Sequence, residues 1–124
     1  MTDPTPLMQG KNGLIMGIAN ERSLAWGIAK AVRAQGAQVA VTYQGEALLK
    51  RVKPLADQLG SELVLPADVT DPASLDALFA EIGRRWGRLD YLVHAVAFSD
   101  KEELKGRYVN TSLENFQRTM LISC

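Results

Sequence analysis

The residues best suited to chemistry lie near the N-terminus, in the segment 17–27, where five residues separate Gly17 from Ser23. A short apolar run, 14–16, precedes the segment, so the pattern predicts a strand, a glycine turn and the start of a helix. Unpaired backbone N–H groups and the positive end of the helix dipole attract phosphate at such a junction. The segment therefore predicts a site for the diphosphate of a dinucleotide.

Individual residues of this turn have distinct expected roles. Gly17 can adopt a φ that other residues avoid and lets a ligand approach the backbone. Ser23 suits a helix N-cap and can donate its hydroxyl to a phosphate oxygen, whereas Gly27 would let the helix pack close to the strand. The fingerprint G-x-G-x-x-G is absent, because Ala19 and Arg22 occupy its next glycine positions. From the turn alone, an ordinary strand-to-helix connection without a nucleotide stays open.

Three more loops follow predicted strands and end at the edge where parallel sheets bind ligands. Gln44 either lies by the adenosine ribose or is only a turn residue. Asp68 either accepts a hydrogen bond from the adenine amino group, with the Val69 backbone beside it, or closes an Asx turn. The loop 96–100 can pass close to the nicotinamide ribose. Because Gln44 is neutral and neither attracts nor repels a 2′-phosphate, the residues alone leave NADH and NADPH both open.

The elements that must position these loops alternate between strand and helix about every 25 residues, which predicts a parallel sheet with right-handed crossovers. The predicted strands span residues 12–16, 39–43, 63–65 and 91–95. The predicted helices span residues 24–35, 46–59 with a kink or break at Pro54, 72–86 after an Asp71 cap, and a last one opening at the capping box Thr111–Glu114. The apolar stripe of the first helix comprises Leu24, Ala25, Ile28, Ala29 and Val32.

The predicted fold class is therefore α/β, the N-terminal half of a Rossmann-like doubly wound parallel sheet with four strands and flanking helices. Residues 1–10 are expected to be a flexible lead-in, and residues 11–124 an incomplete dinucleotide-binding domain. We expect truncation because residues 122–124 supply no cap, glycine or proline to end the last helix, and because doubly wound folds usually carry more strands.

Composition excludes several classes of function. The 124 residues are 47% apolar and 23% charged, as in ordinary globular proteins, and 14 basic residues balance 14 acidic ones. Zero net charge argues against nucleic-acid or anionic-membrane partners held by bulk electrostatics. The single cysteine, Cys124, excludes an internal disulfide and a multi-thiolate metal site, so no metal is expected. With a single cysteine, a reducing, cytoplasmic setting fits. No apolar run approaches the roughly 20 residues of a membrane helix, and no signal peptide is recognisable.

Several ordered segments resemble one enzyme family. They are residues 16–29, 42–46, 65–69, 94–100 and 104–108. Their sequences are similar to the bacterial NADH-dependent enoyl-acyl-carrier-protein reductases, which belong to the divergent short-chain dehydrogenase/reductases. The resemblance covers essentially the whole chain from about Lys11, and agreement of several motifs at matching spacing is more specific than any one of them.

The resemblance implies a cytosolic homotetramer that reduces the trans-2 double bond of an enoyl thioester carried on acyl carrier protein, in type II fatty-acid synthesis. Hydride passes from the nicotinamide to the β-carbon, and the enolate is protonated. It also implies that Gly17, Ser23 and Leu24 contact the cofactor phosphates and the neighbouring ribose. Gln44 would lie by the adenosine ribose, and the match at this position favours NADH over NADPH.

The same resemblance places Asp68 and Val69 by the adenine and lets Val96 and Ala97 border the nicotinamide side. Family members often carry glycine at the position of Ala97, so its methyl group could crowd the cofactor or an inhibitor.

No catalytic residue is predicted within the chain, because the family's catalytic tyrosine and lysine belong to a Tyr-x6-Lys motif beyond Cys124. Tyr43, Tyr91 and Tyr108 are not expected to replace this pair, so the 124-residue chain alone is expected to be inactive. Two alternatives remain beside the enoyl reductase: another short-chain reductase that acts on carbonyls, and a nucleotide-binding module without catalysis.

Overall fold

The computed structural model describes residues 5–124 and contains one parallel sheet. Its strands are β1 (Asn12–Met16), β2 (Gln38–Tyr43), β3 (Leu63–Pro66) and β4 (Tyr91–His94), in the order β3-β2-β1-β4. The helices are α1 (Leu24–Ala34), α2 (Glu46–Leu59), α3 (Pro72–Trp86) and α4 (Leu113–Ser123), with short 3₁₀ helices η1 (Lys101–Leu104) and η2 (Tyr108–Asn110) before α4. The predicted four-stranded, Rossmann-like α/β fold is confirmed.

The strand order reverses between β1 and β4. The chain moves outward from β1 to β3 and then returns to pair β4 with the other side of β1, so that Met16 lies opposite His94. In open parallel sheets, ligands bind beyond the carboxyl ends of the strands at such a reversal. The fold therefore places a binding crevice where β1 and β4 end.

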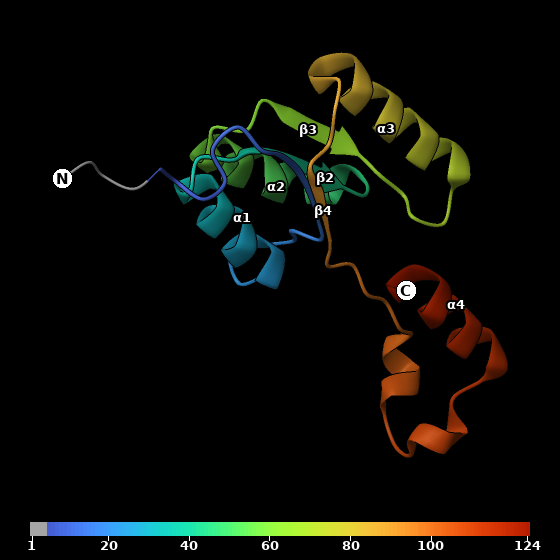
Figure 1. Cartoon of the computed structure of the whole chain (residues 1–124). Coiled ribbons are helices and arrows are strands. Elements are labelled where there is room, and N and C mark those ends of the chain that lie inside the picture. Colours follow the sequence, from blue (N-terminus) through green and yellow to red (C-terminus); the bar gives the residue numbers. More distant parts are fainter. Residues whose placement is uncertain (1–4) are drawn as a thin grey trace.

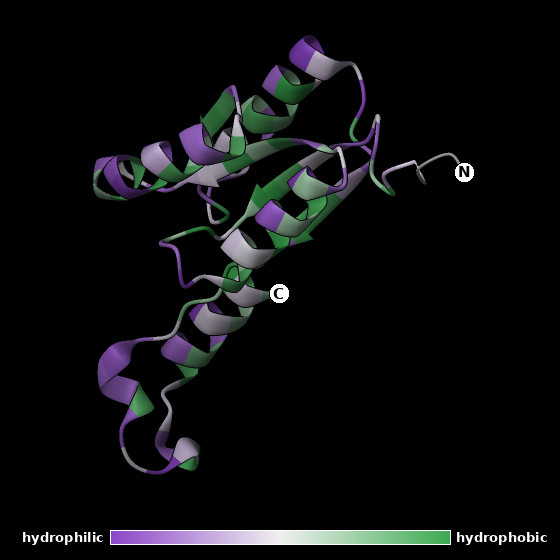
Figure 2. Cartoon of the chain, turned by 90° about the vertical axis from the view of Figure 1, so that its left-hand side faces the viewer, coloured by the Kyte–Doolittle hydropathy of each residue, from purple (hydrophilic) through white to green (hydrophobic). Residues whose placement is uncertain are grey.

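Alternating residues of β1 supply two separate cores. Ile15 belongs to the cluster on the side of α1 and α2, whereas Leu14 and Met16 belong to the cluster on the side of α3. Figure 1 shows α1 and α2 together on one face of the sheet and α3 apart from them, and Figure 2 shows hydrophobic strands between these helices. Burial on both faces explains why residues 39–41 of β2 are apolar without clear alternation.

Helix α1 begins at Leu24 as predicted, and Gly36 follows its end with a left-handed φ of +92°. The predicted apolar stripe is partly wrong, because the Leu24 side chain is 84% exposed and Ile28 is also exposed. Trp26, 5% exposed, fills the core instead. The small Ala25 and Ala29 beside it lie against the sheet, so the buried face is rotated from the predicted stripe.

The role predicted for Gly27 is also wrong. A Cβ at this exposed position would meet no atom within 4 Å. Its missing side chain therefore does not bring α1 closer to the sheet.

Helix α2 contains Pro54 and continues through it, so the predicted break is absent. Pro54 and Lys50, whose carbonyl loses its usual helical donor, both lie on the exposed face of the helix. Water can satisfy the freed carbonyl there, which lowers the cost of an internal proline.

Of the helix caps predicted for α3 and α4, the first is confirmed and the second is wrong. Asp71 caps α3 as predicted, since its Oδ1 accepts a hydrogen bond from Ala73 N at 3.1 Å. The cap of α4 is Ser112, not Thr111, because the Ser112 hydroxyl accepts from Asn115 N at 3.1 Å. Glu103 accepts hydrogen bonds from both Ser112 N and Ser112 Oγ, at 2.6 and 2.8 Å. A residue outside the predicted box therefore fixes this helix start.

The N-terminal segment contacts the end of α1. Met8 N donates to Gln35 O at 2.9 Å, and Met8 packs against the core cluster beneath α1 and α2. Residues 1–4 lie outside the described part, and the boundary between a lead-in and a domain at residues 10 and 11 stays a prediction. Across residues 5–124, no helix combines the length and apolarity needed to cross a membrane.

Candidate functional site

A cleft of about 220 Å³ opens at the carboxyl ends of β1, β2 and β4. It brings together several residues that the sequence singled out, namely Gly17, Gln44, Val69, Val96 and Ala97. Ser23, Leu24 and Asp68 are not among its lining residues. The cleft thus joins the ends of strands that are far apart in sequence, at the reversal of strand order.

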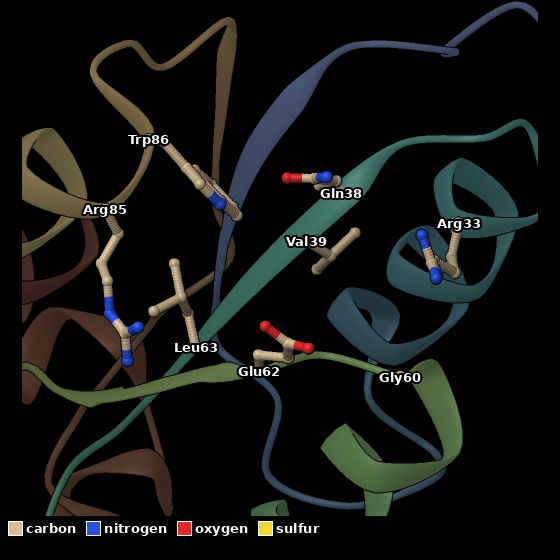
Figure 3. A pocket seen from close by; sticks show the side chains of 8 residues that line it. All are labelled: Arg33, Gln38, Val39, Gly60, Glu62, Leu63, Arg85 and Trp86. Atoms are coloured by element: carbon tan, nitrogen blue, oxygen red, sulfur yellow. The ribbon is translucent and has the colours of Figure 1, made fainter.

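A larger pocket of about 360 Å³ lies elsewhere, at the amino ends of β2 and β3. Figure 3 shows Arg33 and Arg85 on opposite sides of it, with Glu62 between them. Because open parallel sheets bind nucleotides at the carboxyl ends of their strands, its greater size does not make it the nucleotide site.

Gly17 lines the cleft where β1 ends. Its φ is +112°, and a Cβ at this position would lie 2.1 Å from Ala95 O and 2.6 Å from Ala95 C. The same approach is held by a hydrogen bond from Ala95 N to Met16 O at 3.0 Å. Glycine is needed here both for its left-handed backbone and for the close passage of the two chain segments. The sequence does not reveal this neighbour, the chain that leaves β4, and the approach of a ligand to Gly17 stays a prediction.

The Ser23 hydroxyl closes the turn that follows β1. Ser23 is the N-cap residue of α1, as predicted, but its side chain makes no capping bond to the helix. Its Oγ instead accepts hydrogen bonds from Ala19 N at 3.0 Å and Asn20 N at 3.1 Å. A hydroxyl that accepts two such bonds still has its hydrogen to donate, so the geometry remains compatible with a phosphate contact.

The first turn of α1 offers further donors. Trp26 N and Gly27 N both donate to Ser23 O, at 3.1 and 3.3 Å. Leu24 N and Ala25 N have no protein acceptor among the described residues. Since free N–H groups at a helix start attract anions, Leu24 can contact a ligand through its backbone although its side chain faces solvent.

Asp68 follows β3 and forms the Asx turn that was one of its two expected roles. Its Oδ1 accepts hydrogen bonds from Thr70 Oγ1 at 2.6 Å and Thr70 N at 2.9 Å. These bonds, the side-chain one foremost, lower the pKa of the Asp68 carboxyl. Oδ2 takes no hydrogen bond from any described residue, so one carboxylate oxygen is available to a ligand.

Acid stability provides a test of this carboxylate. A pKa lowered by folding adds stability that is complete above the unfolded value of about 3.9 and is lost as pH falls through the folded pKa. Asp68→Asn keeps an oxygen for Thr70 but cannot titrate. We expect urea unfolding between pH 6 and pH 3 to show a smaller loss of stability in the variant than in the parent chain. Parallel curves for the two proteins would contradict this interpretation.

Tyr43 and Lys50 have the Tyr-x6-Lys spacing, although no tyrosine of this chain was expected to replace the family's catalytic pair. Tyr43 ends β2 and packs against the core cluster of α1 and α2, and it lines the cleft beside Gln44. Lys50 is exposed on α2. Strand β1 separates β2 from β4, which amounts to about 10 Å across two strand spacings. The spacing therefore does not bring this pair to the β4 side of the cleft.

Comparison with known proteins identifies the family. A family model described as enoyl-(acyl carrier protein) reductase matches residues 17–124. The chain belongs to this family. An NADH enoyl-[acyl-carrier-protein] reductase of Rhizobium meliloti, number 2 of that organism, is 62% identical over 118 residues, covering 95% of this chain and 44% of the relative. Its number 1 counterpart is 56% identical over 123 residues, covering 99% of this chain and 45% of the relative.

Solved enoyl reductases share the fold. The structure from Anaplasma phagocytophilum, in complex with NAD, is 59% identical with a TM-score of 0.93 and covers 100% of this chain and 47% of that one. The Bacillus cereus enoyl reductase with NADP⁺ and indole naphthyridinone is 42% identical with a TM-score of 0.89, covering 94% of this chain and 46% of that one. The chain thus spans about half the length of the enoyl reductases that it matches.

Proposed function

We propose that the chain is the NADH-binding portion of an enoyl-acyl-carrier-protein reductase. The observation that carries this proposal is the turn between β1 and α1, where Gly17 and Ser23 shape a backbone with free N–H groups beside the cleft. Those groups fit a diphosphate, since they supply donors and the positive end of a helix dipole. Membership of the enoyl reductase family supports the same ligand.

The proposed cofactor follows the cleft across the sheet. Its diphosphate lies on the turn of Gly17, Ser23 and Leu24, with the Leu24 backbone N–H as one donor. Its adenosine lies toward β2 and β3, where Gln44 borders the cleft and Asp68 keeps Oδ2 free. The neutral Gln44 and the names of the NADH-dependent relatives favour NADH. NADPH remains the alternative, since the Bacillus cereus relative was crystallised with NADP⁺.

The nicotinamide end of the cofactor is proposed to lie beside Val96 and Ala97. When bound there, the nicotinamide would supply hydride to the β-carbon of a trans-2 enoyl thioester. The residues of this chain would orient that ring and shield one side of it. Proton donation is assigned to the family's tyrosine and lysine, which lie outside residues 1–124.

For the whole protein we propose an enoyl substrate carried on acyl carrier protein, a cytoplasmic location and a homotetramer. The relatives' names support the substrate. Several large apolar side chains around α4 are exposed, including Leu104, Tyr108 and Leu113. Such a surface would be covered by further protein in an assembled enzyme.

Binding and turnover can be tested separately on this chain. We expect saturation-transfer NMR to detect NADH binding, and an assay with crotonyl thioester to show no enzyme-dependent oxidation of NADH. Failure to bind NADH would refute the cofactor role, and measurable oxidation by the pure chain would refute the assignment of proton donation to residues beyond it.

Removing the Ser23 hydroxyl should weaken NADH binding. Ser23→Ala loses the acceptor for Ala19 N and Asn20 N and the proposed donor to a phosphate. We expect the binding free energy to weaken by about 1 kcal/mol, a typical value for a neutral hydrogen bond, so that the dissociation constant rises about fivefold. Isothermal titration calorimetry measures the change, with Ser61→Ala as control, because the Ser61 hydroxyl donates to Val39 O and Leu63 O at the amino ends of β2 and β3, away from the cleft. An unchanged constant for Ser23→Ala would count against the phosphate contact.

A further inference from the structure

One face of α4 carries polar side chains at intervals of four residues. Asn115, Thr119 and Ser123 have this spacing, which aligns them along a helix. All three make hydrogen bonds to the segment 98–100, which follows the β4 side of the cleft. We call these three side chains and their contacts the α4 ladder.

Asn115 is the centre of the α4 ladder. It is 4% exposed, and its side-chain amide uses both ends. Oδ1 accepts from Asp100 N at 2.9 Å, and Nδ2 donates to Ser99 Oγ at 3.1 Å. A buried amide with both ends paired is costly to displace, because any other arrangement leaves a buried polar group without a partner. Asn115 therefore fixes both the backbone and the side chain of the segment.

Thr119 and Ser123 add hydrogen bonds to this segment closer to the cleft. Thr119 Oγ1 donates to Ser99 Oγ at 3.2 Å. Ser123 Oγ accepts from Phe98 N at 3.1 Å, so the ladder reaches the residue directly after Ala97. The contacts thus approach the cleft along α4: Asn115 holds Asp100 and Ser99, Thr119 holds Ser99, and Ser123 holds Phe98.

The segment held by the α4 ladder is not held by the sheet. The last recorded backbone bond between β1 and the chain after β4 joins Ala95 N to Met16 O. Figure 1 shows the chain leaving the sheet there as an extended stretch that leads to η1 and α4. Val96 and Ala97 therefore lie between two anchors, the sheet at Ala95 and the α4 ladder from Phe98 onward.

We propose that Asn115, Thr119 and Ser123 are positioning residues for the nicotinamide side of the cleft. By fixing the segment 98–100 they set the place of Val96 and Ala97. The inference rests on the proposed function, which puts the nicotinamide beside those two residues. The adenosine and diphosphate contacts come from the ends of β1, β2 and β3 and do not depend on the α4 ladder.

This difference defines the experiment, which compares the chain's affinity for NADH with its affinity for ADP-ribose, which lacks the nicotinamide. Asn115→Ala and Thr119→Val are expected to weaken NADH binding about fivefold, the factor of one neutral hydrogen bond, and to leave ADP-ribose binding unchanged. Thr119→Ser, which keeps the hydroxyl, should restore NADH binding. Gln117→Ala, exposed elsewhere on α4, is the matched control.

Other outcomes overturn the inference. Equal weakening for both ligands would mean a general structural role for the ladder, and no change for either would mean that it does not act on the cleft. A parent chain that binds ADP-ribose but not NADH would refute the nicotinamide placement, whereas one that binds neither would refute the proposed function itself. If Asn115→Ala fails to fold, the near-isosteric Thr119→Val replaces it. The amide NMR shifts of Ala97 and Phe98 in that variant then show whether loss of a ladder contact changes the nicotinamide side of the cleft.

Discussion

Gly17→Ala is expected to destabilise the chain strongly. The new Cβ would lie 2.1 Å from the Ala95 carbonyl oxygen, and the backbone would keep a φ of +112° that alanine avoids. Overpacking and backbone strain each cost about 1–3 kcal/mol, so the free energy of unfolding should fall by about 3 kcal/mol or more. Urea denaturation followed by circular dichroism measures the loss.

Gly27→Ala is the matched control for this variant. It adds the same methyl group to a helical glycine whose surroundings are open. Alanine is the better helix former by up to about 1 kcal/mol, so this variant should be slightly more stable than the parent. A Gly17→Ala chain with parental stability would show that the ends of β1 and β4 are not as close as described.

The second large effect concerns two leucines that the sequence does not distinguish. Leu14 is fully buried in β1, whereas Leu24 is exposed at the start of α1. Leu14→Ala should lower the free energy of unfolding by about 2–5 kcal/mol, the range for cavity-forming core substitutions. Leu24→Ala should change it by no more than about 0.5 kcal/mol.

The same urea titrations decide this pair. Equal losses for Leu14→Ala and Leu24→Ala would restore the apolar stripe that the sequence predicted for α1 and would contradict the orientation found. Because this orientation leaves the Leu24 side chain in solvent, the proposed contact of Leu24 with the cofactor is made by its backbone N–H.

Local signals in the sequence were sufficient to predict the order and type of the strands and the α-helices, but not the short 3₁₀ helices η1 and η2. The strand ends, the left-handed glycines after α1, α2 and α3, and the Asp71 cap all depend on neighbouring residues. The orientation of α1 could not be predicted in this way. Both Leu24 and Trp26 are apolar, and which of them is buried depends on how the helix packs against the sheet. The cap of α4 likewise depends on Glu103, which comes from a separate 3₁₀ helix.

The candidate site likewise has features that could be predicted from local sequence and contacts that could not. Gly17, Gln44, Val69, Val96 and Ala97 could be predicted because each follows the end of a strand. The contact of Gly17 with the Ala95 carbonyl could not, since it requires knowing that β4 pairs with β1. The hold of Asn115 on residues 99 and 100 was equally hidden, because an asparagine within an amphipathic helix has no distinctive local pattern.

Binding of a dinucleotide on the turn after β1 is tested most directly by an NMR titration of the isotope-labelled chain with NADH. We expect shifts in the backbone amides of Gly17, Ala19 and Leu24, together with those of Val96 and Ala97. Shifts confined to the pocket of Arg33, Glu62 and Arg85, or no shift in any amide, would contradict it.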